Sequence, residues 1–231
     1  MKQAAQFAFK QTIPVLCGYL FLGAAFGLLL NNAGYGVLWA FCISLVVFAG
    51  SGQFLLVTML SAGMNLVNVA VLTFTVNSRH MFYGLSFIEK FKAMGKAYPY
   101  MILSLTDETY SLLCGVKVPE NIDKNKAFFL MALFDHLYWI GGSVLGNLLG
   151  SGGFFDITGV EYAMTALFIV IFVEQLSEYA NRLPAVIGAV CGVVSLAVFK
   201  AENFILPALF ATVVVLLLLR PVFGKREGGK A

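Results

Sequence analysis

Charged side chains are scarce in this chain. Only 12% of the 231 residues are Asp, Glu, Lys or Arg, whereas an average soluble domain contains about 25%. The longest polar stretches are 89–96, 117–126 and the basic tail 220–231, and none is long enough to fold as a water-soluble domain. These absences exclude a soluble globular protein and predict a single all-α, polytopic membrane domain over residues 1–231.

Common signatures of enzymes, metal sites and nucleotide binding are missing as well. The cysteines lie in separate apolar segments without C-x-x-C spacing, so we expect free thiols and no metal site. There is no G-x-x-x-x-G-K-[ST] phosphate loop and no H-E-x-x-H or Ser/His/Asp spacing. Basic residues flank apolar segments instead of forming a patch for nucleic acid. We expect no enzymatic activity and no cofactor.

Apolar residues are abundant: 60% of the chain is hydrophobic and the mean hydropathy is +0.87. A helix needs roughly 20 apolar residues to cross a bilayer, and runs of about that length cover 12–31, 37–62, 66–87, 98–116, 127–149, 161–177, 185–199 and 203–219. They predict about seven transmembrane helices with the N-terminus outside if 98–116 folds back, or eight with the N-terminus inside if it crosses. The distribution of Lys and Arg does not decide between these.

An internal repeat is suggested by a shift of 119 residues, which places Tyr19 on Tyr138, Gly23 on Gly142, Gly27 on Gly146 and Gly34 on Gly153. The copies would cover 12–87 and 127–199. We favour inverted copies with broken helices, because that architecture recurs in secondary transporters and places broken helices at the bilayer midplane.

The stretch "VFAGSGQF" contains small and polar residues in the middle of an apolar run. Glycine weakens a helix by about 1 kcal/mol relative to alanine, so Gly50, Ser51 and Gly52 predict a break. Free backbone groups there, with Gln53 beside them, would face a substrate. The alternative is close helix packing through small residues.

Polar residues lie deep in two further runs. Asn77 and His80 share a helical face, and Arg79 beside them needs compensation in a membrane unless it is an anchor that reaches the interface. Asp107 and Glu108 are adjacent, and one could pair with Arg79 while the other titrates, unless both belong to an interfacial hairpin. Arg79, His80, Asp107 and Glu108 form the predicted charge and proton network, and Asn77 joins the predicted substrate site.

Weaker candidates are Asp135 and His136 in the fifth run and Glu174 and Gln175 near the end of the sixth. Asp135 lies about eight residues inside its run, roughly 12 Å at the rise of an α-helix. Glu174 could simply lie at the interface. We rank these four residues second.

Four ordered motifs, "IPVLCGYLFLGAAFG", "FAGSGQF", "NSRHMFYG" and "TDETY", resemble the branched-chain amino acid exporter family of the AzlC type. The similarity extends over most of the chain, up to about residue 200. Gly52 departs from the family pattern, where alanine is usual in "FAGSAQF".

The resemblance implies export of leucine, isoleucine and valine, and in some members methionine, through a multi-pass protein of the cytoplasmic (inner) membrane. It also implies proton coupling and a small hydrophobic partner subunit of the AzlD type. A rival interpretation is a passive channel or a scaffold subunit for another small solute, which needs no titratable groups at depth.

Overall fold

A computed structural model describes residues 2–152, 159–160, 162, 165–166, 169–170, 172–173 and 183–227. All regular secondary structure in these ranges is helical, as predicted from the sequence. The chain divides into two compact units, Met1–Thr165 and Ala166–Ala231. The predicted site residues within the described ranges all belong to the first unit.

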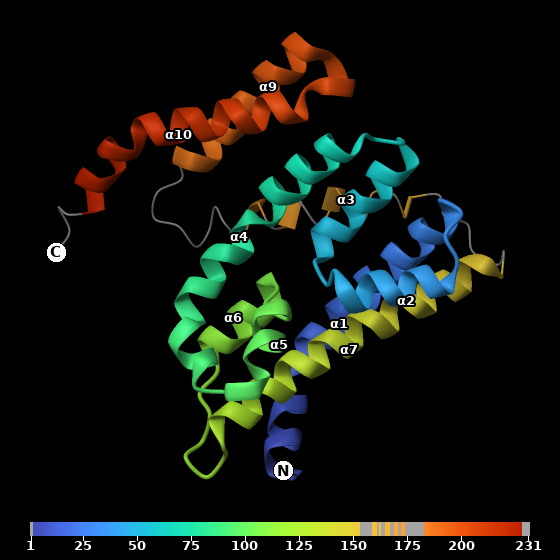
Figure 1. Cartoon of the computed structure of the whole chain (residues 1–231), viewed down its shortest axis with the longest axis vertical. Coiled ribbons are helices and arrows are strands. Elements are labelled where there is room, and N and C mark those ends of the chain that lie inside the picture. The colour runs from blue at the N-terminus through green and yellow to red at the C-terminus, as the bar shows by residue number, and fades with distance from the viewer. Residues whose placement is uncertain are drawn as a thin grey trace. The chain divides into compact units, whose positions relative to one another are not determined.

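Helices α1 (Lys2–Asn32) and α7 (Lys124–Ser151) run parallel and pack directly against each other (Figure 1). A β-carbon added to Gly146 would overlap the carbonyl oxygen of Ala24, so the two backbones touch, as small residues allow between transmembrane helices. The glycines of this contact are Gly23, Gly27, Gly142 and Gly146. Within the described ranges, α1 and α7 are the two helices long and apolar enough to cross a bilayer.

The run 37–62 forms two helices, α2 (Val37–Val46) and α3 (Gly50–Ser61). Helix α2 runs back along α7 from one end toward its middle. The side-chain amide of Asn147 donates to the carbonyl of Tyr35 just before α2 (2.9 Å), and Nε2 of His136 lies 3.2 Å from the carbonyl of Ser44 near its end.

Helix α3 then runs back toward the C-terminal end of α7, where α2 begins. Its first turn lies at Trp139, which donates to Oε1 of Gln53 at 2.8 Å. One turn later, the ring of Phe54 packs 6.1 Å from the ring of Phe26, which lies about two turns beyond the middle of α1. Helices α2 and α3 therefore form a re-entrant hairpin with its bend at mid-length of α1 and α7.

Helix α4 (Leu66–Lys92) leads from that hairpin to the opposite end of the unit. A short η1 turn (Gly95–Ala97) follows, and then α5 (Tyr98–Leu103) and α6 (Asp107–Gly115). Six and nine residues give lengths of only about 9 and 14 Å, which are too short to cross a bilayer core of about 30 Å.

Helices α5 and α6 form a second hairpin, which enters from the opposite end to the first. Met101 of α5 and Leu113 of α6 belong to one buried cluster with Ala8 of α1 and Phe128 of α7, near the first turns of both long helices. The bend between them, at Thr106, lies beside Tyr19 in the middle of α1. The run 98–116 therefore folds back, which was one of the two expected alternatives.

Two sequence-based expectations need correction. The run 37–62 was expected to be one broken span, but it is a hairpin, because its bend allows α3 to turn back along α1. The inverted orientation expected for the copies at 12–87 and 127–199 does not hold for their first helices, because α1 and α7 are parallel. The total number of crossings and the extent of the repeat stay predictions, since most of 153–182 lies outside the described residues.

Every lysine between residues 2 and 152 lies at the end of the unit that holds the start of α1, the end of α4 and the start of α7. These are Lys2, Lys10, Lys90, Lys92, Lys96, Lys117, Lys124 and Lys126. We call this region the lysine end. Large apolar side chains such as Phe21, Leu38 and Leu66, at 73, 71 and 84% exposure, cover much of the remaining surface, as expected for a protein surrounded by lipid.

The second compact unit contains α9 (Leu183–Asn203) and α10 (Ile205–Glu227), which pack against each other as an antiparallel pair. The turn between them is at Phe204, and Gly188 of α9 faces Thr212 of α10. The basic tail predicted at 220–231 begins within α10, and residues 228–231 lie outside the described residues.

Candidate functional site

The break in the first hairpin lies at Val47–Ala49, one turn before the position expected from the sequence. Gly50 is the first residue of α3, so Gly50, Ser51 and Gly52 form its first turn. Phe48 has a φ of 36°, a left-handed conformation that is strained for a bulky residue. Its ring stacks on His136 at 4.1 Å and packs edge-on against Tyr19 at 6.3 Å, and this packing holds the strained bend in place.

Gln53 stabilises the bend from inside. Its Oε1 accepts from the backbone amide of Ala49 (3.3 Å) and from Nε1 of Trp139 (2.8 Å), and its Nε2 donates to the hydroxyl of Ser44 (3.2 Å). A backbone group freed from a helix inside a membrane costs several kcal/mol unless it is satisfied. The glutamine therefore supplies the partner that the bend removes from Ala49.

The first turn of α3 presents free amides. The first backbone bond of the helix runs from the amide of Gln53 to the carbonyl of Ala49 (2.8 Å), so the amides of Gly50, Ser51 and Gly52 have no acceptor within the helix. A helix N-terminus carries a partial positive charge that favours anions. The carboxamide of Asn77 packs against this turn, since a β-carbon added to Gly52 would lie 3.0 Å from Oδ1 of Asn77.

Arg79 connects the first turns of two half-helices. Its Nη2 lies 2.8 Å from Oδ2 of Asp107, the first residue of α6, and 2.5 Å from the hydroxyl of Ser51 on α3. The side chains of Arg79 and Asp107 are only 20 and 27% exposed. The expected pairing of Arg79 with a carboxylate is therefore present, and Arg79 is directed into the protein instead of reaching for the interface.

Three polar atoms of this cluster are buried without a hydrogen-bond partner in the described part of the chain: Oδ1 of Asn77, Nε of Arg79 and Oδ1 of Asp107. Two are acceptors and one is a donor. Buried polar groups are nearly always satisfied in proteins, so a concentration of unpaired atoms around one ion pair indicates a place that receives a polar ligand.

The other predicted residues lie around this cluster. His80 follows Arg79 on α4, with its ring centre 6.0 Å from that of Tyr83. Glu108 follows Asp107 and accepts from the hydroxyl of Tyr19 at 2.8 Å. Glu174 and Gln175 lie outside the described residues.

Asp135 and His136, ranked second from the sequence, are both buried on α7. Oδ2 of Asp135 accepts from the hydroxyl of Thr109 at 3.0 Å, and its Oδ1 has no partner among the described residues. His136 faces the carbonyl of Ser44 with Nε2 and the hydroxyl of Tyr100 with Nδ1 (3.1 Å). Asp135 is thus connected to α6, whereas His136 supports the bend of the first hairpin.

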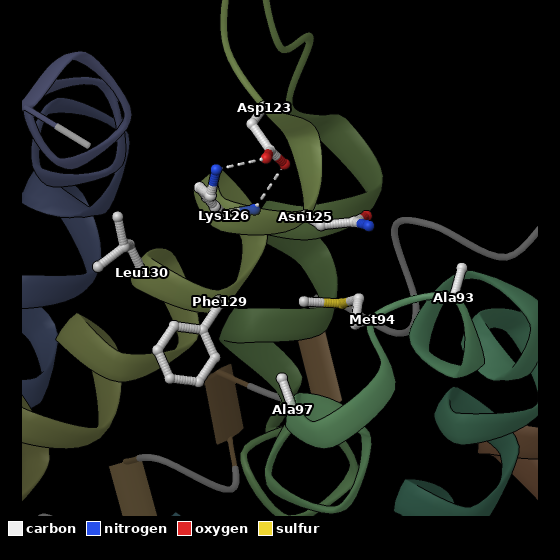
Figure 2. Close-up of a pocket in the computed structure, with 8 residues that line it drawn as sticks. All are labelled: Ala93, Met94, Ala97, Asp123, Asn125, Lys126, Phe129 and Leu130. Carbon is white, nitrogen blue, oxygen red and sulfur yellow. Dashed lines mark hydrogen bonds and ion pairs between the residues drawn. The ribbon is translucent and has the colours of Figure 1, made fainter.

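A cavity of about 420 Å³ opens at the lysine end, away from these residues. Figure 2 shows its lining, in which Asp123 contacts the amide of Lys126 and the lysine side chain. The lining residues are Ala93, Met94, Ala97, Asp123, Asn125, Lys126, Phe129 and Leu130. It contains none of the predicted site residues, so we place the candidate site at the unpaired polar cluster and not at this cavity.

Sequence reasoning missed Tyr19, Thr106, Thr109 and Trp139, which connect the predicted residues. Thr106 was detectable, because a threonine followed by two acidic residues is a typical start of a helix. It caps α6 by accepting from the amide of Thr109 at 3.3 Å. Tyr19 and Trp139 gave no such signal, because aromatic residues in an apolar run are ordinary core residues.

Comparison with known proteins identifies the family. The model of the AzlC protein family matches residues 14–152. The chain is 39% identical to the branched-chain amino acid transport protein AzlC of Bacillus subtilis (strain 168), over 95% of this chain and 87% of that protein. It is 42% identical to a membrane protein of Helicobacter pylori (strain ATCC 700392 / 26695), over 92% of this chain and 93% of the relative.

The Escherichia coli (strain K12) inner membrane protein YgaZ is 27% identical over 195 residues, which are 80% of this chain and 79% of that protein. No solved structure matches the chain. The family match extends from residue 14, within α1, to the end of α7, and this part of the chain contains the described site. The chain therefore belongs to the AzlC family of membrane transport proteins.

Proposed function

We propose that this chain exports branched-chain or other small hydrophobic amino acids across the cytoplasmic membrane, coupled to proton movement. The observation that carries the proposal is the set of unpaired atoms around Arg79 and Asp107. An amino acid zwitterion offers a carboxylate that accepts hydrogen bonds and an ammonium that donates them. The cluster offers donors and acceptors for both.

The carboxylate would bind at the first turn of α3. The free amides of Gly50, Ser51 and Gly52 and the Nε atom of Arg79 are donors, and the helix N-terminus adds a favourable electrostatic field. The ammonium would bind to Oδ1 of Asn77 and Oδ1 of Asp107. Gln53, whose side chain is engaged at the bend, would support this site without contacting the substrate.

Leucine, isoleucine and valine are the substrates we propose, in line with the name of the Bacillus subtilis relative, a branched-chain amino acid transport protein. His80, Asp107, Glu108 and Arg79 would form the proton and charge network. A small hydrophobic partner subunit of the AzlD type is part of the proposal, on the basis of the family resemblance. Its co-purification with a tagged copy of this chain tests that point.

Transport by purified protein in liposomes tests the function. We expect an imposed pH difference to drive radiolabelled leucine against its concentration gradient. Ser51→Leu should abolish leucine binding, because the larger side chain fills the space beside Arg79. Ser61→Leu is the matched control, since Ser61 is an exposed residue at the other end of α3. Leucine flux that only equilibrates would instead identify a passive channel.

A further inference from the structure

Two carboxyl groups, that of the half-buried Glu108 and that of the buried Asp135, are connected by an unbroken series of hydroxyls. The hydroxyl of Tyr19 lies 2.8 Å from Oε2 of Glu108 and 2.6 Å from the hydroxyl of Thr106. The hydroxyl of Thr106 lies 3.1 Å from that of Thr109, which lies 3.0 Å from Oδ2 of Asp135. We call these five residues the hydroxyl chain. All four contacts have hydrogen-bond distances.

Four of the five residues of the hydroxyl chain are shielded from the surroundings. Thr106, Thr109, Tyr19 and Asp135 are buried, and Glu108, which is partly exposed, is the member next to Asp107. The hydroxyl chain connects three helices: Tyr19 belongs to α1, Asp135 belongs to α7, and the other residues belong to α6 and its N-cap. The hydroxyl chain therefore leads from the Arg79–Asp107 pair to Asp135 in the buried middle of α7.

The hydroxyl chain has fewer hydrogens than contacts when both of its carboxyl groups are ionised. Its three hydroxyls supply three hydrogens for four contacts, so with both carboxyls ionised one contact would bring two oxygens together without a hydrogen. A fourth proton, on either Glu108 or Asp135, completes all four bonds. The geometry points to one carboxyl proton that the two ends of the hydroxyl chain share.

We propose that the hydroxyl chain is a proton relay, which carries a proton between the substrate site and the buried middle of α7. Its members are Glu108, Tyr19, Thr106, Thr109 and Asp135. When Glu108 is protonated, it donates to Tyr19, Tyr19 to Thr106, Thr106 to Thr109, and Thr109 to Asp135. Each oxygen then passes its hydrogen one place along: Glu108 loses a proton, Asp135 gains one, and each hydroxyl keeps one hydrogen. No other reactant is needed.

The charged neighbours favour movement of the proton when substrate binds. Asp107 and Arg79 lie beside Glu108, and His136 lies beside Asp135. An ammonium group bound at Asp107 would add a positive charge close to Glu108, which favours the ionised form of Glu108. Substrate binding would thus shift the proton toward Asp135. This step rests on the proposed function, whereas the shared proton itself does not.

The test compares Thr109→Val, which removes a hydroxyl from the middle of the relay, with Thr109→Ser, which keeps it. In liposomes, the ratio of pH-driven leucine uptake to leucine counterflow should be largely lost in Thr109→Val, because valine can neither accept nor donate the hydrogen that the relay passes on. Thr109→Ser should retain the wild-type ratio. Tyr19→Phe, a second interruption, should behave like Thr109→Val. An unchanged ratio in both interrupted variants would overturn the relay.

Infrared spectroscopy tests the relay without any substrate. Wild-type protein at neutral pH should show a protonated carboxyl band that weakens in both Glu108→Gln and Asp135→Asn and shifts in Thr109→Val but not in Thr109→Ser. Absence of that band, or its indifference to Thr109→Val, would overturn the relay. If wild-type protein does not move leucine but the band behaves as expected, the proposed substrate is wrong and the shared proton stands.

Discussion

Arg79 and Asp107 lie 2.8 Å apart, on α4 and on the first turn of α6. The same guanidinium group reaches Ser51 on the first turn of α3. Two half-helices that enter from opposite ends of the unit are thus joined by one cation, at a level where a membrane contains little water. Charges at such a depth are costly and are usually functional.

Asp107→Asn should reduce leucine transport by about tenfold or more, because the loss of a partner leaves the Arg79 charge unpaired in a largely desolvated site. Asp107→Glu keeps the charge and serves as the matched control. Efflux from liposomes measures the effect, and size-exclusion chromatography checks that both variants remain folded. Normal transport by Asp107→Asn would remove this ion pair from the mechanism.

His80→Ala should abolish proton-coupled efflux while insertion into the membrane is retained. The side chain lies next to Arg79 and packs near Tyr83, so its removal takes a titratable group from the network without removing a core residue. His80→Gln, which keeps polarity but cannot change charge, should behave in the same way. pH-driven leucine flux at wild-type rates in both variants would exclude His80 from proton coupling.

Gly146→Ala should destabilise the protein by about 1–3 kcal/mol, the usual cost of overpacking. The added methyl group would overlap the carbonyl oxygen of Ala24 on α1. Gly141→Ala on the same helix is the matched control, because nothing lies within 4 Å of its added β-carbon. Thermal unfolding in detergent compares the two, and equal melting temperatures would contradict the direct backbone contact.

The lysine end should face the cytoplasm, because loops rich in Lys and Arg stay on that side. This places the start of α1 inside, whereas the sequence predicted it outside if 98–116 folds back, because 37–62 was then counted as a crossing. Single cysteines replacing Lys96 and Lys117, before and after the second hairpin, should both react with an impermeant thiol reagent from the cytoplasmic side. Cysteines at Gly34 and Gly63, which flank the first hairpin, should react from the opposite side. Labelling of positions 96 and 117 from opposite sides would show that α5 and α6 cross the membrane.

The start of α7 should become less stable in acid. The side chain and amide of Lys126 hydrogen bond to Asp123 and hold the pKa of this exposed carboxyl below its usual range. A carboxyl group whose pKa is lower in the folded than in the unfolded protein stabilises the fold at a pH above its unfolded-state pKa. This stabilisation is lost as the pH falls through its folded-state pKa. Asp123→Asn should flatten this dependence, measured as unfolding temperature against pH, while Asn125→Asp should not.

The sequence singled out polar residues that the structure brings together, but it did not reveal the path of the chain. Asn77, Arg79 and Asp107 were recognised because polar residues in apolar runs have few explanations. The bend at Phe48 was missed, since a strained phenylalanine is stabilised by contacts with His136 and Tyr19 that no local pattern encodes.

A hydropathy profile does not distinguish a re-entrant hairpin from a helix that crosses the membrane. The run 37–62 is long enough for one span. The contacts of Tyr35 and Ser44 with α7 give the direction of α2, and the packing of Phe54 on Phe26 shows that α3 turns back. The orientation of α1 and α7 was equally hidden, because the glycines that suggested a repeat make the same pattern in parallel and inverted copies. The pairing of Gly23 with Gly142 and of Gly27 with Gly146 in the structure shows that the two helices are parallel.

The glycine contact between α1 and α7 has a mechanical consequence. Displacing one helix along the other by a single residue, about 1.5 Å, would move the backbone of Leu20 away from Gly142, whose missing side chain leaves room for it. We therefore expect α1 and α7 to move together as one rigid pair and not to slide along each other.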